Sequence, residues 1–145
     1  MKLSIDPSIN STGFAISQNN KIIASGVIKT KGKNDSEKLK SLFCQIENLY
    51  KKFKFDMVIL EITDFFIYQT RKNPFSGKPL NIKSLCKLNK AIAIIELFCS
   101  MNNIKLIELT PAQWKNNLSK SIIIALTKKK NHNEAEAILL NQVAG

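Results

Sequence analysis

Residues 3–16 place one carboxylate between two short apolar runs, and this stretch constrains the fold more than any other. The first run ends in Asp6, turn-forming residues follow as far as Gly13, and a second apolar run starts at Phe14. The pattern predicts two strands, over residues 2–6 and 12–18, with Asp6 at the carboxyl end of the first. Gly13 suits the tight return, where a side chain would crowd the backbone or a substrate. One carboxylate at a strand end does not make a functional site by itself, so the rest of the chain is expected to supply further functional side chains near Asp6.

The charge balance predicts a polyanionic partner. The 145 residues carry 22 Lys and Arg against 11 Asp and Glu, which gives a net charge of +11 and a pI near 9.7. Nucleic acid is favoured over an acidic membrane, because the chain has no apolar run of about 18 residues and no separate basic amphipathic helix. Surface lysine without a specific partner is the alternative explanation.

The remaining elements alternate between strands and helices, which predicts one α/β domain over residues 1–145. A third strand, over Lys21 to Thr30, follows a hairpin turn at Gln18-Asn19-Asn20. A long helix with apolar residues at three- and four-residue steps comes next, with Asp35 or Ser36 as its cap. A continuously apolar strand then ends in a second acid, Glu61. The later elements are predicted as a helix over about 80–101, a strand over 104–109, a short helix from 111, a helical stretch over 119–130 and a last helix over 134–142.

Cysteine usage and the amino terminus bear on the cellular setting. Cys44, Cys86 and Cys99 lie within apolar helical patterns and have no metal-ligand spacing, so all three are predicted to be reduced core residues. The chain enters a strand at its start, which predicts an intracellular, cytoplasmic protein without a signal peptide.

Acids at two strand ends, and further acids at the start of the last helix, predict a metal site. Carboxylates gathered on one sheet edge repel one another unless cations neutralise them, and Mg²⁺ or Mn²⁺ prefers oxygen ligands. Two such ions about 3.5–4 Å apart activate a water and stabilise the leaving oxygen of a phosphodiester. A basic protein with such a cluster is predicted to be a metal-dependent nuclease that needs no small-molecule cofactor.

Two later stretches predict interaction surfaces. Residues 63–79 interleave aromatic and basic residues with turn formers, as in a loop that stacks on bases and holds phosphates, and a solvent loop held by one or two aromatics is the alternative. The helix over 80–101 is apolar over most of its circumference, which predicts a homodimer seam. The nucleic-acid-binding residues expected from the loop and this helix are Phe65, Phe66, Tyr68, Arg71, Lys72, Lys78, Lys83, Lys87 and Lys90.

The order of these elements and residues resembles the RuvC-like Holliday junction resolvases of the ribonuclease H-like superfamily, and the resemblance covers nearly the whole chain. No single motif carries it, but the order and spacing together are fairly specific. The chain resembles the compact phage-type members of this family more than the longer bacterial ones. The residues that carry it are Ile5 to Ser8, Thr12-Gly13, Ser25-Gly26, Thr30, Val58 to Glu61, Leu88 to Ala91, Pro111, Trp114-Lys115, Ser119-Lys120 and Glu134 to Ala137.

The resemblance implies a ribonuclease H-like fold, with a five-stranded mixed sheet whose first three strands are antiparallel and which helices flank. It also implies a homodimer that nicks two strands of a four-way DNA junction with divalent metal. Such a protein acts in the cytoplasm, or in the host cytoplasm if a phage encodes it.

Carried over by position, Asp6 and Glu61 match the family's first two metal ligands, and Glu136 takes the place of an Asp that precedes Ala. The family has an Asp or a His three residues earlier, where this chain has Asn133. Positions three and four before Glu136 share its helical face, so His132 and Asn133 are both candidates for the catalytic site. His132 is either a ligand, a proton donor or an exposed residue of the helix start. Glu134 is expected to point away.

Lys90, Lys115 and Lys120 are expected near the site, as phosphate contacts or as groups that stabilise charge developing in the reaction. Three other functions stay open at this point. The first alternative is a different ribonuclease H-like nuclease that acts on flaps or RNA–DNA hybrids. The second is a junction-binding protein with weakened catalysis, and the third is an actin-like or sugar-kinase fragment. The last is disfavoured, because the chain has neither a second domain nor Gly-rich phosphate loops.

Overall fold

The computed structural model describes residues 1–63, 81–115, 118 and 120–143, with Lys120 described by its backbone alone. The order of strands and helices agrees with the prediction from the sequence. The elements are β1 (Lys2–Asp6), β2 (Ser11–Gln18), β3 (Lys21–Lys29), α1 (Asp35–Phe53), β4 (Met57–Glu61), α3 (Ile82–Met101), β5 (Lys105–Leu109), α4 (Pro111–Trp114), α5 (Lys120–Thr127) and α6 (His132–Val143).

One five-stranded mixed sheet forms the centre of the protein, in the order β3-β2-β1-β4-β5. β1, β2 and β3 pair antiparallel, whereas β4 pairs parallel to both β1 and β5. Asn19 and Asn20 join β2 to β3 with positive φ angles of 51° and 60°, which is the backbone twist that a two-residue hairpin requires. The predicted fold class is confirmed.

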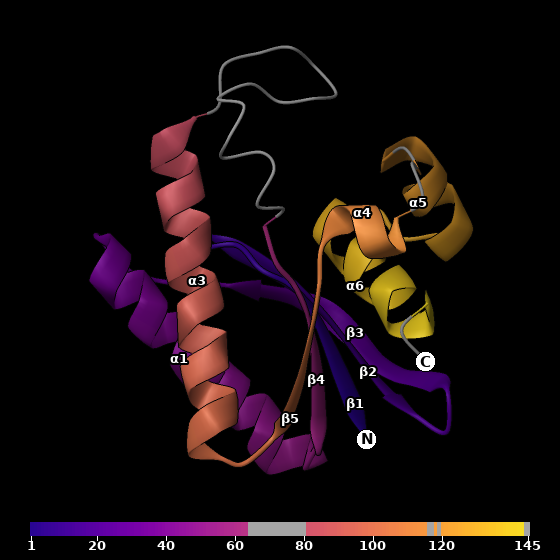
Figure 1. Cartoon of the computed structure of the whole chain (residues 1–145), viewed down its shortest axis with the longest axis horizontal. Helices are drawn as coiled ribbons and strands as arrows, with labels where there is room; N and C mark the ends of the chain where they lie inside the picture. The colour runs from indigo at the N-terminus through magenta and orange to yellow at the C-terminus, as the bar shows by residue number, and fades with distance from the viewer. Residues whose placement is uncertain (64–80, 116–117, 119, 144–145) are drawn as a thin grey trace.

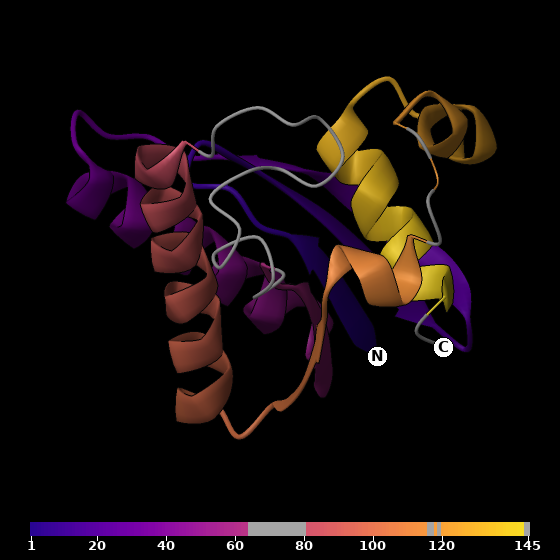
Figure 2. The same cartoon turned by 45° about the horizontal axis from the view of Figure 1, so that its top comes forward.

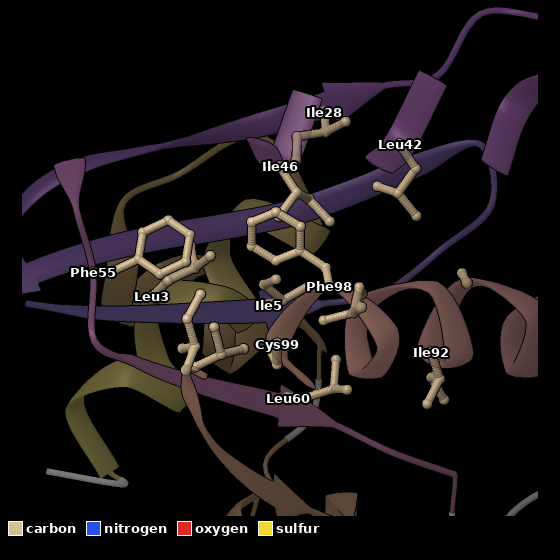
Figure 3. Close-up of a cluster of buried hydrophobic side chains, with 14 of the residues drawn as sticks. Leu3, Ile5, Ile28, Leu42, Ile46, Phe55, Leu60, Ile92, Phe98 and Cys99 are labelled. Atoms are coloured by element: carbon tan, nitrogen blue, oxygen red, sulfur yellow. The ribbon is translucent and has the colours of Figure 1, made fainter. Parts of the chain in front are cut away.

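Helices cover both faces of the sheet (Figures 1 and 2). α1 and α3 lie together on one face, and α4, α5 and α6 lie on the other. The larger core fills the space beneath α1 and α3, where alternate residues of β1 and β4 meet Leu42, Ile46 and Phe98 (Figure 3). Leu3 and Ile5 of β1 and Val58 and Leu60 of β4 belong to this core and so pack the two strands that end in acids.

The start of α1 differs from the prediction. Asn34 caps the helix, because its extended backbone lets Oδ1 accept a hydrogen bond of 2.9 Å from the Glu37 amide. The Glu37 carboxylate in turn accepts a hydrogen bond of 2.7 Å from the Lys33 amide. Predicting Asp35 or Ser36 as the cap was wrong by one or two positions. Asp35 lies in the first helical turn instead, and its carboxylate contacts α3.

The prediction of three core cysteines holds for Cys99 alone. All three are free, but Cys44 and Cys86 are exposed, because their helix positions fall outside the faces that α1 and α3 turn to the core. Burial, followed by the negative charge of Glu96, raises the pKa of the Cys99 thiol to about 11. A thiol of that pKa carries almost no thiolate at neutral pH and is inert.

α3 begins at Ile82, close to the predicted start, and buries only part of its apolar surface. Ile92, Ile95 and Phe98 face the core, while Leu97 and Met101 are 52% and 64% exposed. Within the described part of the chain, no helix has the length and apolar character needed to span a membrane.

Candidate metal centre and nucleic-acid interface

Asp6 and Glu61 end two neighbouring parallel strands, and the register of the sheet sets them side by side. Ile5 lies opposite Leu60 in the β1–β4 pair, so the next residue of each strand is an acid. Side chains alternate between the two faces of a sheet. Ile5 and Leu60 belong to the core beneath α1 and α3, and the two acids therefore point to the face that α6 covers.

α6 supplies the third acid. Asn131 caps the helix through Oδ1, which accepts hydrogen bonds from the amides of Asn133 and Glu134 at 3.0 and 3.2 Å. Further along, Ser4 on β1 donates a hydrogen bond of 2.6 Å to the Ala137 carbonyl, which holds the helix against the sheet. Glu136 is thereby buried at the sheet surface, 5% exposed.

Asp6, Glu61 and Glu136 form one cluster. One carboxylate oxygen from each lies within 4.8 Å of the other two. The three acids come from β1, β4 and α6, which are separated by 55 and 75 residues in the sequence. Only the packing of α6 across the sheet brings them together.

Close approach of α6 depends on Gly13. A Cβ at this position would lie 1.9 Å from the Asn133 carbonyl oxygen, a separation that real atoms do not adopt. At the same place, Nδ2 of Asn133 donates a hydrogen bond to the Ser11 carbonyl. The amide nitrogen of Asn133 thus attaches the start of α6 to β2, which is a structural use of the position where the sequence predicted a catalytic residue.

His132 and Glu134 lie on opposite sides of α6. Nε2 of His132 is 3.2 Å from Oε1 of Glu136, and the imidazole is 21% exposed. Glu134 accepts a hydrogen bond of 2.7 Å from Ser25 and pairs with Lys129 at 2.9 Å. Glu134 is therefore turned to β3, as expected from its helical position, and His132 lies at the rim of the acid cluster.

Trp114 and Lys115 complete the cluster from the end of α4. The buried indole of Trp114 donates a hydrogen bond of 2.9 Å to Oε2 of Glu61. Nζ of Lys115 lies 3.2 Å from Oε1 of Glu61 and 2.5 Å from Oε1 of Glu136. The sequence placed Lys115 near the site, as a phosphate contact or as a group that stabilises developing charge, and assigned Trp114 no role. The pair Trp114-Lys115 at the end of a capped short helix was the available signal, but the sequence does not reveal which acids the two side chains meet.

The electrostatics of the cluster favour a further cation. Burial raises the pKa of Asp6 well above its ordinary value, and the charges of Glu61 and Glu136 add to that shift. Burial also raises the pKa of Glu61, although the Lys115 ammonium opposes it. Burial by itself would lower the pKa of Lys115, but the two glutamates outweigh it and the pKa is raised. One ammonium therefore does not balance three acids.

The donor set fits a hard divalent cation. Three carboxylates on three elements supply the oxygen ligands that Mg²⁺ and Mn²⁺ prefer. Asp6, Glu61 and Glu136 are the residues that would hold such an ion.

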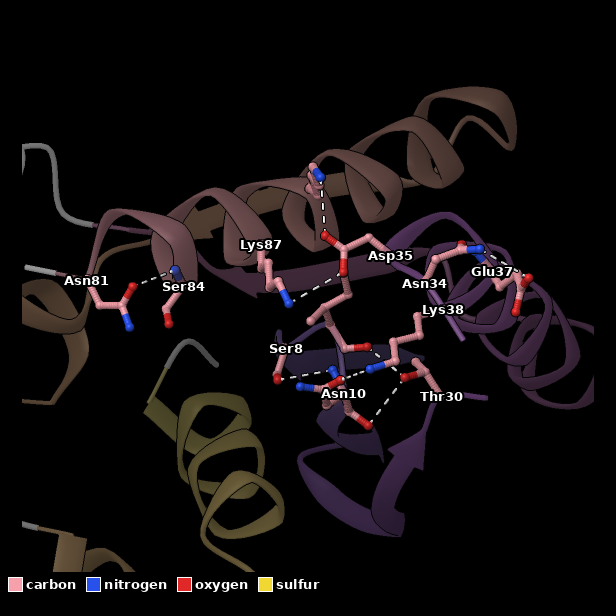
Figure 4. A network of polar contacts seen from close by, with 12 residues as sticks. Ser8, Asn10, Thr30, Asn34, Asp35, Glu37, Lys38, Asn81, Ser84 and Lys87 are labelled. Atoms are coloured by element: carbon pink, nitrogen blue, oxygen red, sulfur yellow. Dashed lines mark hydrogen bonds and ion pairs between the residues drawn. The ribbon is translucent and has the colours of Figure 1, made fainter. Parts of the chain in front are cut away.

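The lysines of α3 form a basic stripe beside this edge of the sheet. Lys83, Lys87 and Lys90 recur at four and three residues, so they share one face of the helix. Lys83 is exposed. Nζ of Lys87 and Nζ of Lys90 lie 3.5 and 3.2 Å from the Asp35 carboxylate at the start of α1 (Figure 4 shows the Lys87 contact).

Several predicted nucleic-acid contacts lie outside the described residues. They are Phe65, Phe66, Tyr68, Arg71, Lys72 and Lys78, together with the side chain of Lys120.

The sheet order, with acids at the carboxyl ends of β1 and β4 and a third acid on α6, defines a ribonuclease H-like fold. Within that class the chain belongs to the RuvC family, because the model of crossover junction endodeoxyribonuclease RuvC matches residues 2–131. The match includes Asp6, Glu61 and Lys115 and ends just before α6. The place of Glu136 in the site therefore rests on the structure.

Similar proteins agree with this assignment. The chain is 29% identical over 123 residues to the crossover junction endodeoxyribonuclease RuvC of Hydrogenovibrio crunogenus, a stretch that covers 80% of this chain and 62% of that relative. A structure of T. thermophilus RuvC in complex with a Holliday junction substrate matches with a TM-score of 0.70 and 14% identity, over 99% of this chain and 92% of that chain. A second Thermus thermophilus RuvC structure matches with a TM-score of 0.70 and 15% identity, over 98% and 91% of the two chains.

Proposed function

We propose that this protein is a single-domain, divalent-metal-dependent endonuclease that resolves four-way DNA junctions by paired nicks. The observation that carries the proposal is the cluster of Asp6, Glu61 and Glu136 at the edge of a sheet of the RuvC family fold. A net charge of +11 suits a polyanionic substrate. The protein acts inside the cell, where branched DNA occurs.

In this proposal Asp6, Glu61 and Glu136 would hold two Mg²⁺ ions, for which Mn²⁺ would substitute. When bound, such ions activate a water and stabilise the leaving oxygen of the phosphodiester. Glu61 is held in orientation by the Trp114 indole, and Glu136 by the packing of α6. His132, 3.2 Å from Glu136, either adds a ligand nitrogen or gives a proton to the leaving oxygen. Asn133 supports the site by fastening α6 to β2.

The DNA surface extends from the acid cluster along α3. Lys83, Lys87 and Lys90 share a helix face and offer contacts to successive phosphates, which position the DNA without reading its sequence. Residues 64–80 add the aromatic and basic side chains predicted for stacking at the junction centre, and Lys120 adds a further phosphate contact.

We also propose a homodimer, because two nicks on a symmetric junction need two sites. The exposed apolar residues of α3, Leu97 and Met101, mark the seam. Sedimentation at micromolar concentration is expected to give a dimer, and a monomer that stays monomeric on DNA would contradict this part of the proposal.

Cleavage of synthetic substrates tests the function. With Mg²⁺ present, we expect symmetric paired nicks in a four-way junction and little cutting of flap, RNA–DNA hybrid or linear duplex. Preference for flap or hybrid would instead identify another ribonuclease H-like nuclease. Binding of the junction without cutting, in both Mg²⁺ and Mn²⁺, would identify a junction-binding protein.

Asp35 forms ion pairs with Lys87 and Lys90, two of the lysines proposed to contact DNA phosphates. Removing its charge is therefore expected to strengthen DNA binding. In Asp35→Asn, Lys87 and Lys90 lose the carboxylate at 3.5 and 3.2 Å and become available to DNA. We expect junction affinity to rise about threefold at moderate salt and the slope of log K against log[salt] to steepen by about 1. The loss of an acid from the first turn of α1 is expected to lower the stability slightly.

Asp56→Asn is the matched control for this prediction. It removes the same charge from an exposed carboxylate, which pairs with the amino terminus at 2.7 Å and precedes β4, at the end opposite Glu61. Equal gains in affinity for both variants would show a general charge effect and contradict the role assigned to Asp35. Fluorescence anisotropy with labelled junction over a salt series measures both.

A further inference from the structure

Lys115 lies among the acids of the candidate metal centre, and its position raises the question of what it does there. Its ammonium is 2.5 Å from Glu136 and 3.2 Å from Glu61, while its side chain is only 20% exposed. Its backbone is fixed by the hydrogen bond of 2.8 Å from its own amide to the Pro111 carbonyl. A lysine that served only as a phosphate contact would extend into solvent instead.

The oxygens of two acids are already engaged in this arrangement. Glu61 accepts from the Trp114 indole at Oε2 and from Lys115 at Oε1. Oε1 of Glu136 faces both Lys115 and His132, at 2.5 and 3.2 Å. An incoming divalent cation therefore meets an ammonium that is already paired with two of the three carboxylates that would hold it.

We propose that Lys115 is the built-in counter-cation of the metal centre: it holds Glu61 and Glu136 together in the metal-free protein and competes with the divalent cation for their oxygens. This inference rests on the proposed metal centre. Lys115 is thus a positioning residue that sets metal affinity. When a divalent cation displaces the ammonium, the flexible four-carbon side chain of Lys115 leaves it free to contact a phosphate of the bound DNA. Metal binding and phosphate contact are therefore coupled.

Two opposite effects follow from this competition. Without metal, removing the ammonium leaves buried acids unpaired, and breaking a buried pair in this way is strongly destabilising. With metal, the cation no longer has to displace a competitor, so its binding is expected to be tighter. A lysine with a purely structural role would lower stability without raising metal affinity.

The test uses Lys115→Met with Mn²⁺ alone as the probe. Trp114 is the only tryptophan in the chain, and its indole contacts Glu61, so its fluorescence reports Mn²⁺ binding without any measurement of cleavage. We expect Lys115→Met to bind Mn²⁺ on the order of tenfold more tightly than the wild type, a typical coupling between interacting sites. In EDTA we expect its melting temperature to be lower by roughly 5–10 °C, and saturating Mn²⁺ to close most of that gap.

Two further variants sharpen the result. Lys115→Arg keeps the charge and is expected to stay close to the wild type in EDTA without the gain in Mn²⁺ affinity. Lys51→Met is the matched control, because it removes one lysine from an exposed ion pair with Glu47 at 2.9 Å on α1. It is expected to change neither Mn²⁺ affinity nor the melting temperature in EDTA appreciably.

The wild type provides a test that does not depend on folding of a variant. Labelling by an amine-reactive reagent, read by mass spectrometry, is expected to rise several-fold at Lys115 when Mg²⁺ is added and to stay constant at Lys51. Unchanged labelling of Lys115, or weaker Mn²⁺ binding by Lys115→Met, overturns the proposal for Lys115 and leaves the metal centre intact. A wild type that binds no Mn²⁺ overturns both.

Discussion

Asp6→Asn is expected to reduce junction cleavage by about 1,000-fold or more while junction binding stays within about threefold of the wild type. Asp6 lies in one cluster with Glu61 and Glu136, and an amide does not supply the charge that a divalent cation needs from its ligand. Loss of several kcal/mol of transition-state stabilisation corresponds to about three powers of ten in rate. Single-turnover cleavage in Mg²⁺ and binding in EDTA measure the two properties separately.

Glu134→Gln is the matched control for this prediction. Its carboxylate is on the same helix as Glu136 but pairs with Ser25 and Lys129, so cleavage is expected to stay within about threefold of the wild type. Wild-type cleavage by Asp6→Asn would refute the metal centre as proposed.

The same variant carries a stability prediction with a definite sign. The pKa of Asp6 is raised by burial and by the charges of Glu61 and Glu136, so the folded protein binds the proton more tightly than the unfolded chain does. Stability conferred by a group of this kind is present at low pH and is lost as pH rises from the ordinary pKa of the acid through its raised folded value. In EDTA at pH 8, Asp6→Asn is therefore expected to melt above the wild type, and at low pH the two should converge.

Gly13→Ala is expected to cost about 3 kcal/mol or more, because the added carbon would lie 1.9 Å from the Asn133 carbonyl oxygen. The atom it meets belongs to the backbone of α6, so relief requires the whole helix start to move. That movement would also carry Glu136 away from Asp6. Urea unfolding measures the stability, and Mn²⁺ titration measures the loss of the site in whatever fraction folds.

Gly26→Ala is the matched control for this prediction. Its added carbon would meet only the edge of the Phe14 ring, at 3.0 Å, which a small ring shift relieves at a cost of about 1 kcal/mol or less. Equal destabilisation by the two substitutions would show that the approach of α6 to β2 is not what requires Gly13.

The elements that the sequence predicted well are those with local signals. An apolar run that ends in an acid identified Asp6 and Glu61, and the three- and four-residue apolar steps identified α1. The Asn19-Asn20 turn identified the β2–β3 hairpin. Each of these patterns reflects backbone geometry within a few residues. The cap of α1 was misplaced because Asn34, Asp35 and Ser36 are all good cap residues, and only the backbone angle at Asn34 selects among them.

The exposure of two cysteines was missed for a related reason. Cys44 and Cys86 lie in apolar helical patterns, but the direction of each helix face depends on what packs against it. The lysines of α3 show the same limit. Their helix positions predicted a shared face, whereas their contact with Asp35 depends on where α1 begins and how it crosses α3.

The sequence by itself determined the class of fold, the excess of positive charge and the two strand-end acids, because these depend on local patterns and composition. The resemblance had already named Glu61 and Glu136 as ligands beside Asp6. Only the tertiary structure decided how these side chains meet and which other groups contact them. It brought Glu136 to the cluster, engaged the amide nitrogen of Asn133 with β2, and placed the Lys115 ammonium between two acids. The physical reason is that α4 and α6 follow β1 by more than 100 residues in the chain, and that the approach of α6 depends on a glycine without a side chain and on packing across the sheet. In the local sequence pattern Asp6 is a lone acid on a strand end, and contacts between distant elements make it part of the candidate metal centre.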